Sequence, residues 1–339
     1  MLLDSKTMQF SRFSVLGLLA CALLLPGYVS AGQQAAADFA EQEYPALSSP
    51  ALSKLTGTLS SNGSDTLHNM MMLWRREFVA KHPQLNIQIQ SSGSATAPVA
   101  LIEGTASFGP MSRPMIMAEQ RRFRNRFGYD AYAVPVALDM LALYVHQDNP
   151  LQQISMAELE GVYAQNRRCS YHPAVTLWGD LGLTGAWQFR PLAVYGRNPA
   201  SGTYAFFRQR ALCNDDFQNK VQQLPGAAAV VRAVSLSVNG LGYSGFGQQI
   251  AGVKMLAVSK DPESAAILPS AEHALSGAYP LARLLYIYVN KPPAQLLPAA
   301  EREFMRFILS AKGQQLLLSD GLVPIPEELV SQISQELGL

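Results

Sequence analysis

Residues 58–78, TLSSNGSDTLHNMMMLWRREF, contain in succession the three parts from which the fold is predicted. Residues 58–61 are a short strand candidate, and a loop of small and polar residues, 62–66, follows it. Beyond the loop, apolar side chains recur at helical spacing and share one face: Leu67, Met70, Met71, Trp74 and Phe78. A strand, a polar loop and an amphipathic helix in this order predict one unit of an α/β domain.

The same order of elements recurs after this stretch. Ile87 and Ile89 alternate with glutamines, which is typical of a strand with one buried face. The elements that follow are a polar loop at 91–94, a helix around 99–103, a third strand at 106–109 and a loop at 110–114. The repetition predicts a largely parallel α/β sheet.

Two later apolar strands predict how the chain is divided. Residues 134–145 form a long apolar strand with one charge, Asp139, and residues 284–289 form a second such strand. A chain that leaves its first domain and returns forms two lobes joined by a hinge. We therefore expect two doubly wound sheets joined by two strands, with lobe I at 55–138 and 284–339 and lobe II at 139–283. An amphipathic helix is predicted at 304–318 and a solvated arginine-rich helix face at 121–126.

The N-terminal residues have the pattern of a secretory signal. Lys6 and Arg12 precede an apolar stretch, 13–29, and small residues precede the expected cleavage after Ala31. This predicts a periplasmic protein with a leader at 32–54. A membrane anchor is disfavoured, because Pro26 and Gly27 interrupt a stretch already short for a bilayer. Lipid attachment at Cys21 is the alternative, although the apolar stretch continues beyond that cysteine.

Charge and cysteine content narrow the function classes. The predicted signal carries Lys6, Arg12 and Asp4, so its removal lowers the formal net charge from +1 to 0. A neutral protein has no overall field to attract nucleic acid, so recognition of an anion must be local. Cys169 and Cys213 are the cysteines that remain, and in an exported chain they predict one disulfide.

Enzyme signatures are missing from the sequence. Residues 242–246 resemble a nucleophile elbow, but Phe246 replaces its last glycine. No phosphate-binding P-loop or dinucleotide fingerprint occurs, and the five histidines lack metal-ligand spacing. We expect no enzyme activity, no cofactor and no metal.

Small hydroxyl residues instead occupy three loops that precede predicted helices. The loops are 63–66 (GSDT), 93–96 (GSAT) and 201–203 (SGT), and Arg197 lies four residues before the third. Helix N-termini carry free N–H groups and a partial positive charge, so such loops bind tetrahedral oxyanions. An arginine adds a planar fork for two oxygens of the anion. Ordinary helix capping is the alternative explanation for each loop.

These segments and several others resemble the PstS-like phosphate-binding proteins of ABC transporters. The resemblance spans about residues 56–327, through GSDTLHNMMMLWRREFVAKHP, SSGSATAPVALIEGTASFGPMSRP, VPVALDMLALYVHQDNP, YGRNPASGTYAFF, NGLGYSG, YPLARLLYIYVN and FILSAKGQQLLLSDGLVPIP. It implies a two-lobed periplasmic-binding-protein fold of type II, a monomer that takes inorganic phosphate, and a permease in the inner membrane as partner. The family's oxyanion site maps onto Ser64, Ser94, Arg197, Ser201, Gly202 and Thr203, and we add Thr66 from the first loop.

The resemblance leaves one part of the site open. Family members use a carboxylate to accept a hydrogen bond from a protonated phosphate oxygen, in some members from the loop after the third strand. Here Ser112 and Arg113 occupy that loop and are taken as candidate ligands, with Asp65 as the nearest carboxylate and Asp139 as the next. Alternatives for the whole protein are a binder of sulfate, molybdate or tungstate, a secreted hydrolase, and an exported phosphate-binding adhesin.

Overall fold

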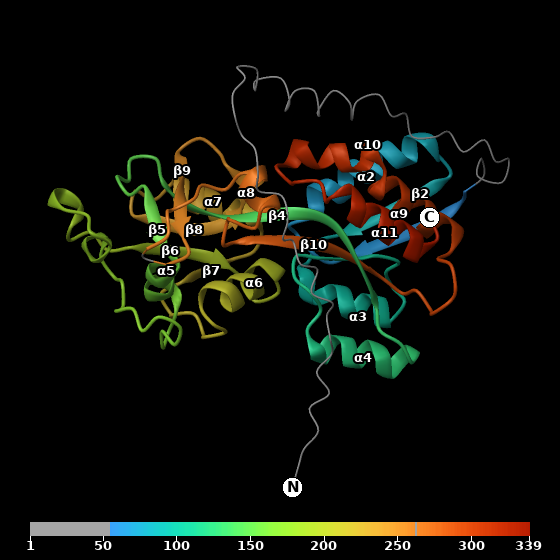
Figure 1. Ribbon diagram of the computed structural model, residues 1–339, viewed down its shortest axis with the longest axis horizontal. Helices are drawn as coiled ribbons and strands as arrows, with labels where there is room; N and C mark the ends of the chain where they lie inside the picture. Colours follow the sequence, from blue (N-terminus) through green and yellow to red (C-terminus); the bar gives the residue numbers. More distant parts are fainter. Residues whose placement is uncertain (1–54, 262) are drawn as a thin grey trace, which may run out of the picture. The chain divides into compact units, whose positions relative to one another are not determined.

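The computed structural model describes residues 55–261 and 263–339 (Figure 1). Its strands are β1 Gly57–Asn62, β2 Leu85–Gln90, β3 Gly109–Met111, β4 Tyr132–His146, β5 Gln153–Ser155, β6 Ala193–Arg197, β7 Gln222–Leu224, β8 Gly240–Gly245, β9 Val253–Ser259 and β10 Ala282–Val289. β1 and β2 pair as a parallel two-stranded sheet. An eight-stranded sheet runs β3-β10-β4-β8-β6-β7, with β9 paired to β4 and β5 paired to β9.

Helices alternate with these strands along the chain. The α-helices are α2 His68–Lys81, α3 Ala97–Ile102, α4 Met117–Phe127, α5 Met156–Tyr163, α6 Gly202–Ala211, α7 Ala227–Ser235, α8 Ala271–Leu275, α9 Ala299–Leu309, α10 Ala311–Gln315 and α11 Glu327–Leu337. The 3₁₀-helices are η2 Ser94–Thr96, η3 Trp178–Leu181, η4 Gly185–Trp187, η5 Phe246–Gln248 and η6 Leu316–Asp320. The α/β class predicted from the sequence is confirmed.

The unit predicted from residues 58–78 is present as β1, a loop and α2. The apolar face of α2 is buried, as its spacing predicts, and Trp74 and Met70 have no exposed area. Trp74 also donates from Nε1 to the carbonyl of Gly313, at 2.9 Å. The hydrogen bond satisfies the polar atom of a buried indole, so the helix is held to the C-terminal part of the chain as well as to its own sheet.

β4 and β10 lie side by side and carry the chain in opposite directions (Figure 1). β4 is therefore antiparallel to β10, and it is also antiparallel to β8 and β9. The prediction of a largely parallel sheet is wrong at this point, because one strand leads out of a lobe and the other leads back. β4 and β10 also join strands of both lobes into one eight-stranded sheet. Of the described strands, β1 and β2 form the second, separate sheet.

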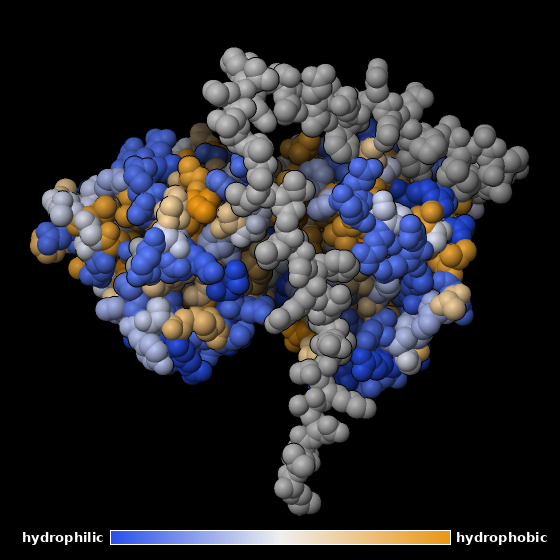
Figure 2. Space-filling view, in the orientation of Figure 1, coloured by the Kyte–Doolittle hydropathy of each residue, from blue (hydrophilic) through white to orange (hydrophobic). Residues whose placement is uncertain are grey.

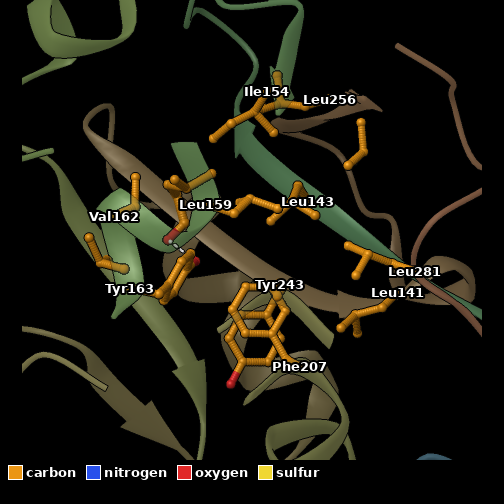
Figure 3. Close-up of a cluster of buried hydrophobic side chains, with 14 of the residues drawn as sticks. Leu141, Leu143, Ile154, Leu159, Val162, Tyr163, Phe207, Tyr243, Leu256 and Leu281 are labelled. Atoms are coloured by element: carbon orange, nitrogen blue, oxygen red, sulfur yellow. Dashed lines mark hydrogen bonds between the residues drawn. The ribbon is translucent and has the colours of Figure 1, made fainter. Parts of the chain in front are cut away.

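Two large buried clusters form the hydrophobic core. One lies mostly within residues 140–281 and contains Tyr163, Phe207 and Tyr243, whose rings stack or meet edge-on (Figure 3). The other combines residues 55–137 with residues 285–337 and contains Trp74 and Phe304. A two-lobed fold requires a separate core in each lobe, and the two clusters meet this requirement.

Two predicted elements have different boundaries in the structure. The helix expected at 304–318 is broken at Ser310, whose extended backbone ends α9 and whose hydroxyl accepts from the N–H of Gly313 to cap α10. The strand expected at 106–109 begins at Gly109, where pairing with β10 begins, while Phe108 forms a single bridge to Ser61.

The predicted disulfide between Cys169 and Cys213 is confirmed, with a Cα–Cα distance of 5.8 Å. Two buried carboxylates hold the loops that it joins. Glu160 accepts from the N–H of Cys169 at 2.5 Å, and Asp215 accepts from the N–H of Asn166 at 2.6 Å. Burial raises the pKa of Asp215, but hydrogen bonds from Asn166 and its neighbours outweigh burial and leave that pKa lowered.

The predicted arginine-rich face lies on α4. Phe123 is buried on its inner side, while Arg121, Arg122, Arg124 and Arg126 are exposed. In the face shown in Figure 2, hydrophilic residues predominate and hydrophobic ones form separate, smaller patches. Among the described residues, no helix has both the length and the apolar character needed to cross a bilayer. The predicted signal, its cleavage after Ala31 and the leader lie outside the described residues.

Candidate functional site

The first hydroxyl loop follows β1. The N–H of Ser64 donates to the carbonyl of Pro110 at 2.7 Å, and the Ser64 hydroxyl accepts from the N–H of Thr66 at 3.2 Å. Ser64 is buried, and α2 begins only after Leu67, which offers no side-chain cap. Ser64 is therefore held inward by a turn before the helix, and capping of α2 does not explain its position.

The second loop contributes Ser94, which has no exposed area. Gly93 precedes it with φ of +110°, a conformation that L-residues rarely adopt, and its N–H donates to the carbonyl of Gly63. The Ser94 hydroxyl accepts from the N–H of Ser112 at 3.0 Å and lies 3.2 Å from the Ser112 hydroxyl. The loops after β2 and β3 thus bring these two buried hydroxyls together.

The third loop opens α6. The Ser201 hydroxyl accepts from the N–H of Thr203 at 3.1 Å and is the N-cap of the helix, so capping does account for this contact. A Cβ on Gly202 would lie 2.4 Å from the Ser94 hydroxyl and 2.5 Å from that of Ser112. The third loop therefore approaches the other loops so closely that only glycine fits at this position.

Arg197, at the end of β6, is buried and pairs with Asp65 of the first loop. Its Nη2 lies 3.0 Å from Asp65 Oδ2, and the same oxygen accepts from the N–H of Ala227 at 3.0 Å. Ala227 is the first residue of α7, whose N-cap, Gly226, has no side chain to offer. The Asp65 carboxylate thus caps a helix from another part of the chain. Burial lowers the pKa of Arg197, Asp65 opposes that effect, and the charge of Arg283 adds to it.

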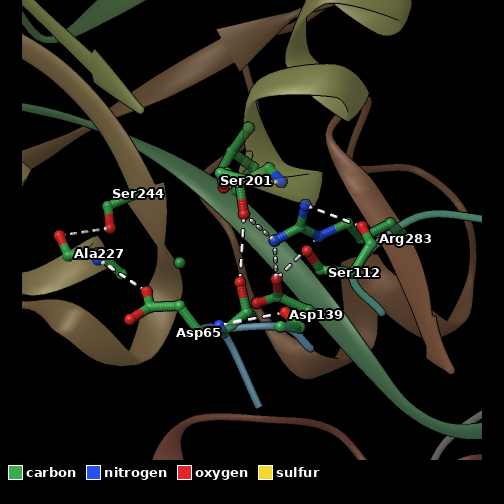
Figure 4. Close-up of polar contacts among 12 residues, drawn as sticks. Asp65, Ser112, Asp139, Ser201, Ala227, Ser244 and Arg283 are labelled. Atoms are coloured by element: carbon green, nitrogen blue, oxygen red, sulfur yellow. Dashed lines mark hydrogen bonds and ion pairs between the residues drawn. The ribbon is translucent and has the colours of Figure 1, made fainter. Parts of the chain in front are cut away.

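Asp139 and Arg283 form a second pair, which is almost wholly buried (Figure 4). They are opposite each other in the register of β4 and β10. Asp139 Oδ2 accepts from Arg283 Nε at 2.9 Å and from Nη2 at 2.7 Å. Sequence reasoning singled out Asp139 but missed Arg283. The available signal was that each residue is a charge within an apolar strand.

Most of the predicted residues come together in one network. Thr203 connects the loops, since its hydroxyl lies 3.1 Å from that of Thr66 and accepts from Arg283 Nη2 at 2.9 Å. Arg283 Nη1 donates to the carbonyl of Ser112 at 3.1 Å, which extends the network to Ser94. Arg113 has different partners: its guanidinium forms two hydrogen bonds to Glu119, at 2.6 and 2.7 Å. Within the described chain, no hydrogen bond or ion pair joins Arg113 to the network.

Three polar atoms of this site are buried and have no hydrogen-bond partner among the described residues. They are Nε and Nη1 of Arg197 and Oδ1 of Asp139. Leaving such atoms unpaired costs about 1–3 kcal/mol each, and more for charged groups. The arrangement therefore suits a small buried ligand that both accepts hydrogen bonds and donates one. No cluster of three or more metal-binding side chains occurs in the described parts of the chain.

Comparison with known proteins agrees with this geometry. A family model described as the PBP superfamily domain matches residues 48–312. The phosphate-binding protein PstS of Pseudomonas aeruginosa strain PAO1 is 44% identical over 320 residues, which cover 94% of this chain and 98% of that protein. The protein SphX of Synechococcus elongatus is 27% identical over 281 residues, covering 82% and 80% of the two chains.

A solved structure shares the fold at lower identity. A candidate substrate-binding protein of a phosphate ABC transporter from Clostridium perfringens, solved with bound phosphate, superposes with a TM-score of 0.67 and 22% identity. The match covers 80% of this chain and all of that one. The family model and the relative of 44% identity show that this chain belongs to the PBP superfamily and to its PstS-like phosphate-binding proteins.

Proposed function

We propose that this chain is an exported binding protein that captures inorganic phosphate between two lobes and delivers it to the permease of an ABC transporter. The observation that carries the proposal is the set of buried, unpaired polar atoms: two donors on Arg197 and one acceptor on Asp139. A ligand that satisfies all three must present oxygen acceptors and at least one O–H. Phosphate does both near neutral pH.

The donors available to the ligand come from different segments. Arg197 supplies two N–H groups, and the hydroxyls of Ser64, Ser94 and Thr203 surround the same region. Helix N-termini at α6 and η2 add backbone N–H groups and favour negative charge. We propose these residues, with Thr66, Ser112, Ser201 and Gly202, as the phosphate site. Arg113 we place outside it, because Glu119 occupies its guanidinium.

We assign to Asp139, and not to Asp65, the selection of phosphate over other oxyanions. Asp65 Oδ2 is engaged by Arg197 and by the N-terminus of α7, whereas Asp139 Oδ1 is buried and unpaired. A carboxylate oxygen accepts the O–H of phosphate but faces bare oxygen in sulfate, molybdate or tungstate. Two unit charges 4 Å apart repel by about 4 kcal/mol at an effective dielectric of 20. That repulsion disfavours the fully deprotonated oxyanions.

The division of the chain follows the same proposal. We assign residues 55–138 and 284–339 to lobe I and residues 139–283 to lobe II, with β4 and β10 as the hinge. Lobe I supplies the first two loops, and lobe II supplies Arg197 and the loop at α6. The proposal also includes a signal cleaved after Ala31, a leader at 32–54, a monomeric state and the lack of enzyme activity.

Calorimetry on the chain from Gly32 to Leu339, freed of bound anions by unfolding and refolding, tests the function. Phosphate should bind with one site per chain, and sulfate and molybdate should bind at least about 100-fold more weakly, a difference of about 2.7 kcal/mol. Absence of binding heat with phosphate, or a preference for sulfate or molybdate, would refute the proposal. Loss of phosphate uptake on deletion of the gene tests the delivery step.

A further inference from the structure

Arg283 contacts three different segments of the candidate site. Its guanidinium donates to Asp139 on β4, to the carbonyl of Ser112 and to the hydroxyl of Thr203, at 2.7 to 3.1 Å. It also lies 5.2 Å from the ring centroid of Phe206, within the range of a cation–π contact. Only 6% of the residue is exposed. A cation buried to this extent is fixed in orientation by its partners.

The contacts of Arg283 divide the two oxygens of Asp139. Both hydrogen bonds to Asp139 go to Oδ2, from Nε and Nη2, and Oδ1 has no partner among the described residues. The guanidinium therefore determines which carboxylate oxygen is engaged and which remains to accept a proton from a ligand. Figure 4 shows the carboxylate and the guanidinium meeting between the loops.

Asp320, Tyr144 and Tyr279 lie near enough to Asp139 for its charge to raise the pKa of each, and none of the three is a cation. Asp320, at the end of η6, is a second carboxylate; burial raises its pKa first of all, and the charge of Asp139 raises it further. Tyr144 and Tyr279 are phenols whose pKa burial raises, again with a contribution from Asp139. Arg283, on β10, is the cation that pairs with Asp139 in the described chain.

We propose that Arg283 is a positioning residue that holds Oδ2 of Asp139 and leaves Oδ1 turned to the ligand, and thereby sets the preference for a protonated oxyanion over one without a proton. The inference rests on the proposed function and names the residue behind its selectivity. Arg283 acts through Asp139, and it does not bind the ligand itself.

Loss of the guanidinium should release the orientation of the Asp139 carboxylate. Both hydrogen bonds that hold Oδ2 come from Arg283, so without them Oδ1 is no longer kept turned to the ligand. Phosphate then loses a fixed acceptor for its O–H, and sulfate is no longer faced by a fixed carboxylate oxygen.

Calorimetry with phosphate and with sulfate, on the wild-type protein and on two variants, tests the inference. Arg283→Gln should lower the ratio of phosphate to sulfate affinity at least about tenfold, and Arg283→Lys, which keeps the charge, should leave that ratio within about threefold. Arg208→Gln is the matched control, because Arg208 pairs with Asp216 elsewhere on lobe II, at 2.8 Å. Its ratio should equal that of the wild type.

A double-mutant cycle separates positioning from other roles. In an Asp139→Asn background, Arg283→Gln should change the ratio by less than about threefold, since the group through which it acts is gone. An unchanged ratio in Arg283→Gln, or an equal fall in both backgrounds, would overturn the inference. Melting curves without ligand identify a purely structural role, which would lower stability and leave the ratio unchanged. Failure of the wild-type protein to bind phosphate would instead count against the proposed function.

Discussion

The Asp65–Arg197 pair joins loops of the two proposed lobes, whereas the Asp139–Arg283 pair joins neighbouring strands of the proposed hinge. The Asp65 side chain is 28% exposed, and its carboxylate is also the cap of α7. The Asp139 side chain is 1% exposed and lies opposite Arg283 in the pairing of β4 with β10. One pair forms only where two loops meet, and the other is part of the sheet.

This difference indicates two roles for the same kind of pair. In the first pair the Asp65 side chain is partly exposed while Arg197 is buried, so solvent can reach one partner of this pair. A buried pair is costly to break from one side, because the remaining charge stays buried. The strand pair therefore suits a permanent element of the site, and the loop pair suits a contact made on closure.

The largest expected effect is on stability, from Asp139→Asn. The change leaves the Arg283 cation buried without its counterion, which should lower the free energy of unfolding by about 3–5 kcal/mol. Urea unfolding of the ligand-free protein measures the loss. Asp216→Asn, which removes a pair whose carboxylate is 78% exposed, is the control and should cost less than about 1 kcal/mol. Similar losses in both variants would erase the contrast between buried and exposed pairs.

Arg197→Ala should give the largest loss of ligand affinity. It removes two unpaired buried donors, Nε and Nη1, and hydrogen bonds to charged groups contribute about 1.5–3 kcal/mol each. Phosphate affinity measured by calorimetry should fall at least about 100-fold. Arg232→Ala, an exposed arginine of α7, should leave affinity unchanged. If Arg197→Ala lowers phosphate affinity by less than about threefold, the arginine holds the loops together through Asp65 and does not bind the ligand.

Asp65→Asn should act on closure without changing selectivity. The cap on α7 weakens, at a cost of about 0.5–2 kcal/mol, so affinities for phosphate and sulfate should fall together by up to about tenfold. The sequence alone places Asp65 first among the candidates for the proton-accepting carboxylate, and in that role its change to Asn would lower the ratio of phosphate to sulfate affinity. Paired titrations with the two anions decide between them. A fall in the ratio of phosphate to sulfate affinity would return the selective role to Asp65.

The smallest expected effect concerns the surroundings of the strand pair. Burial raises the pKa of Asp320 above its ordinary value of 3.8, and the nearby charge of Asp139 adds to this. Between 3.8 and the raised pKa, Asp320 is protonated in the folded protein and ionised in the unfolded chain. Stability therefore falls as the pH rises through this range. Asp320→Asn should be more stable than wild type at neutral pH, with the difference vanishing toward pH 4. Melting curves of Asp320→Asn and of wild type at neutral pH and at pH 4 measure this difference, and the comparison is repeated in an Asp139→Asn background. A stability difference that is the same at both pH values would contradict the prediction.

Local sequence patterns determined the elements and the loops of this protein. The apolar spacing from Leu67 to Phe78 gave α2, and the small residues at 63–66, 93–96 and 201–203 gave the three hydroxyl loops. Both cysteines of the disulfide were predictable, because the predicted removal of Cys21 with the signal leaves one possible pairing. These features depend on backbone preferences within a few residues, which a sequence displays directly.

Tertiary structure alone decided which charges meet. Asp139 and Arg283 are 144 residues apart, and their pairing depends on the register of β4 against β10, which local preference does not fix. Asp65 was predicted to face the ligand, but packing of the first loop against α7 turns its Oδ2 to Ala227 and Arg197. The end of α9 at Ser310, inside a stretch predicted as one helix, likewise appears only in the folded chain. Long-range packing sets these contacts, because each is formed by residues whose own segments would fold equally well without it.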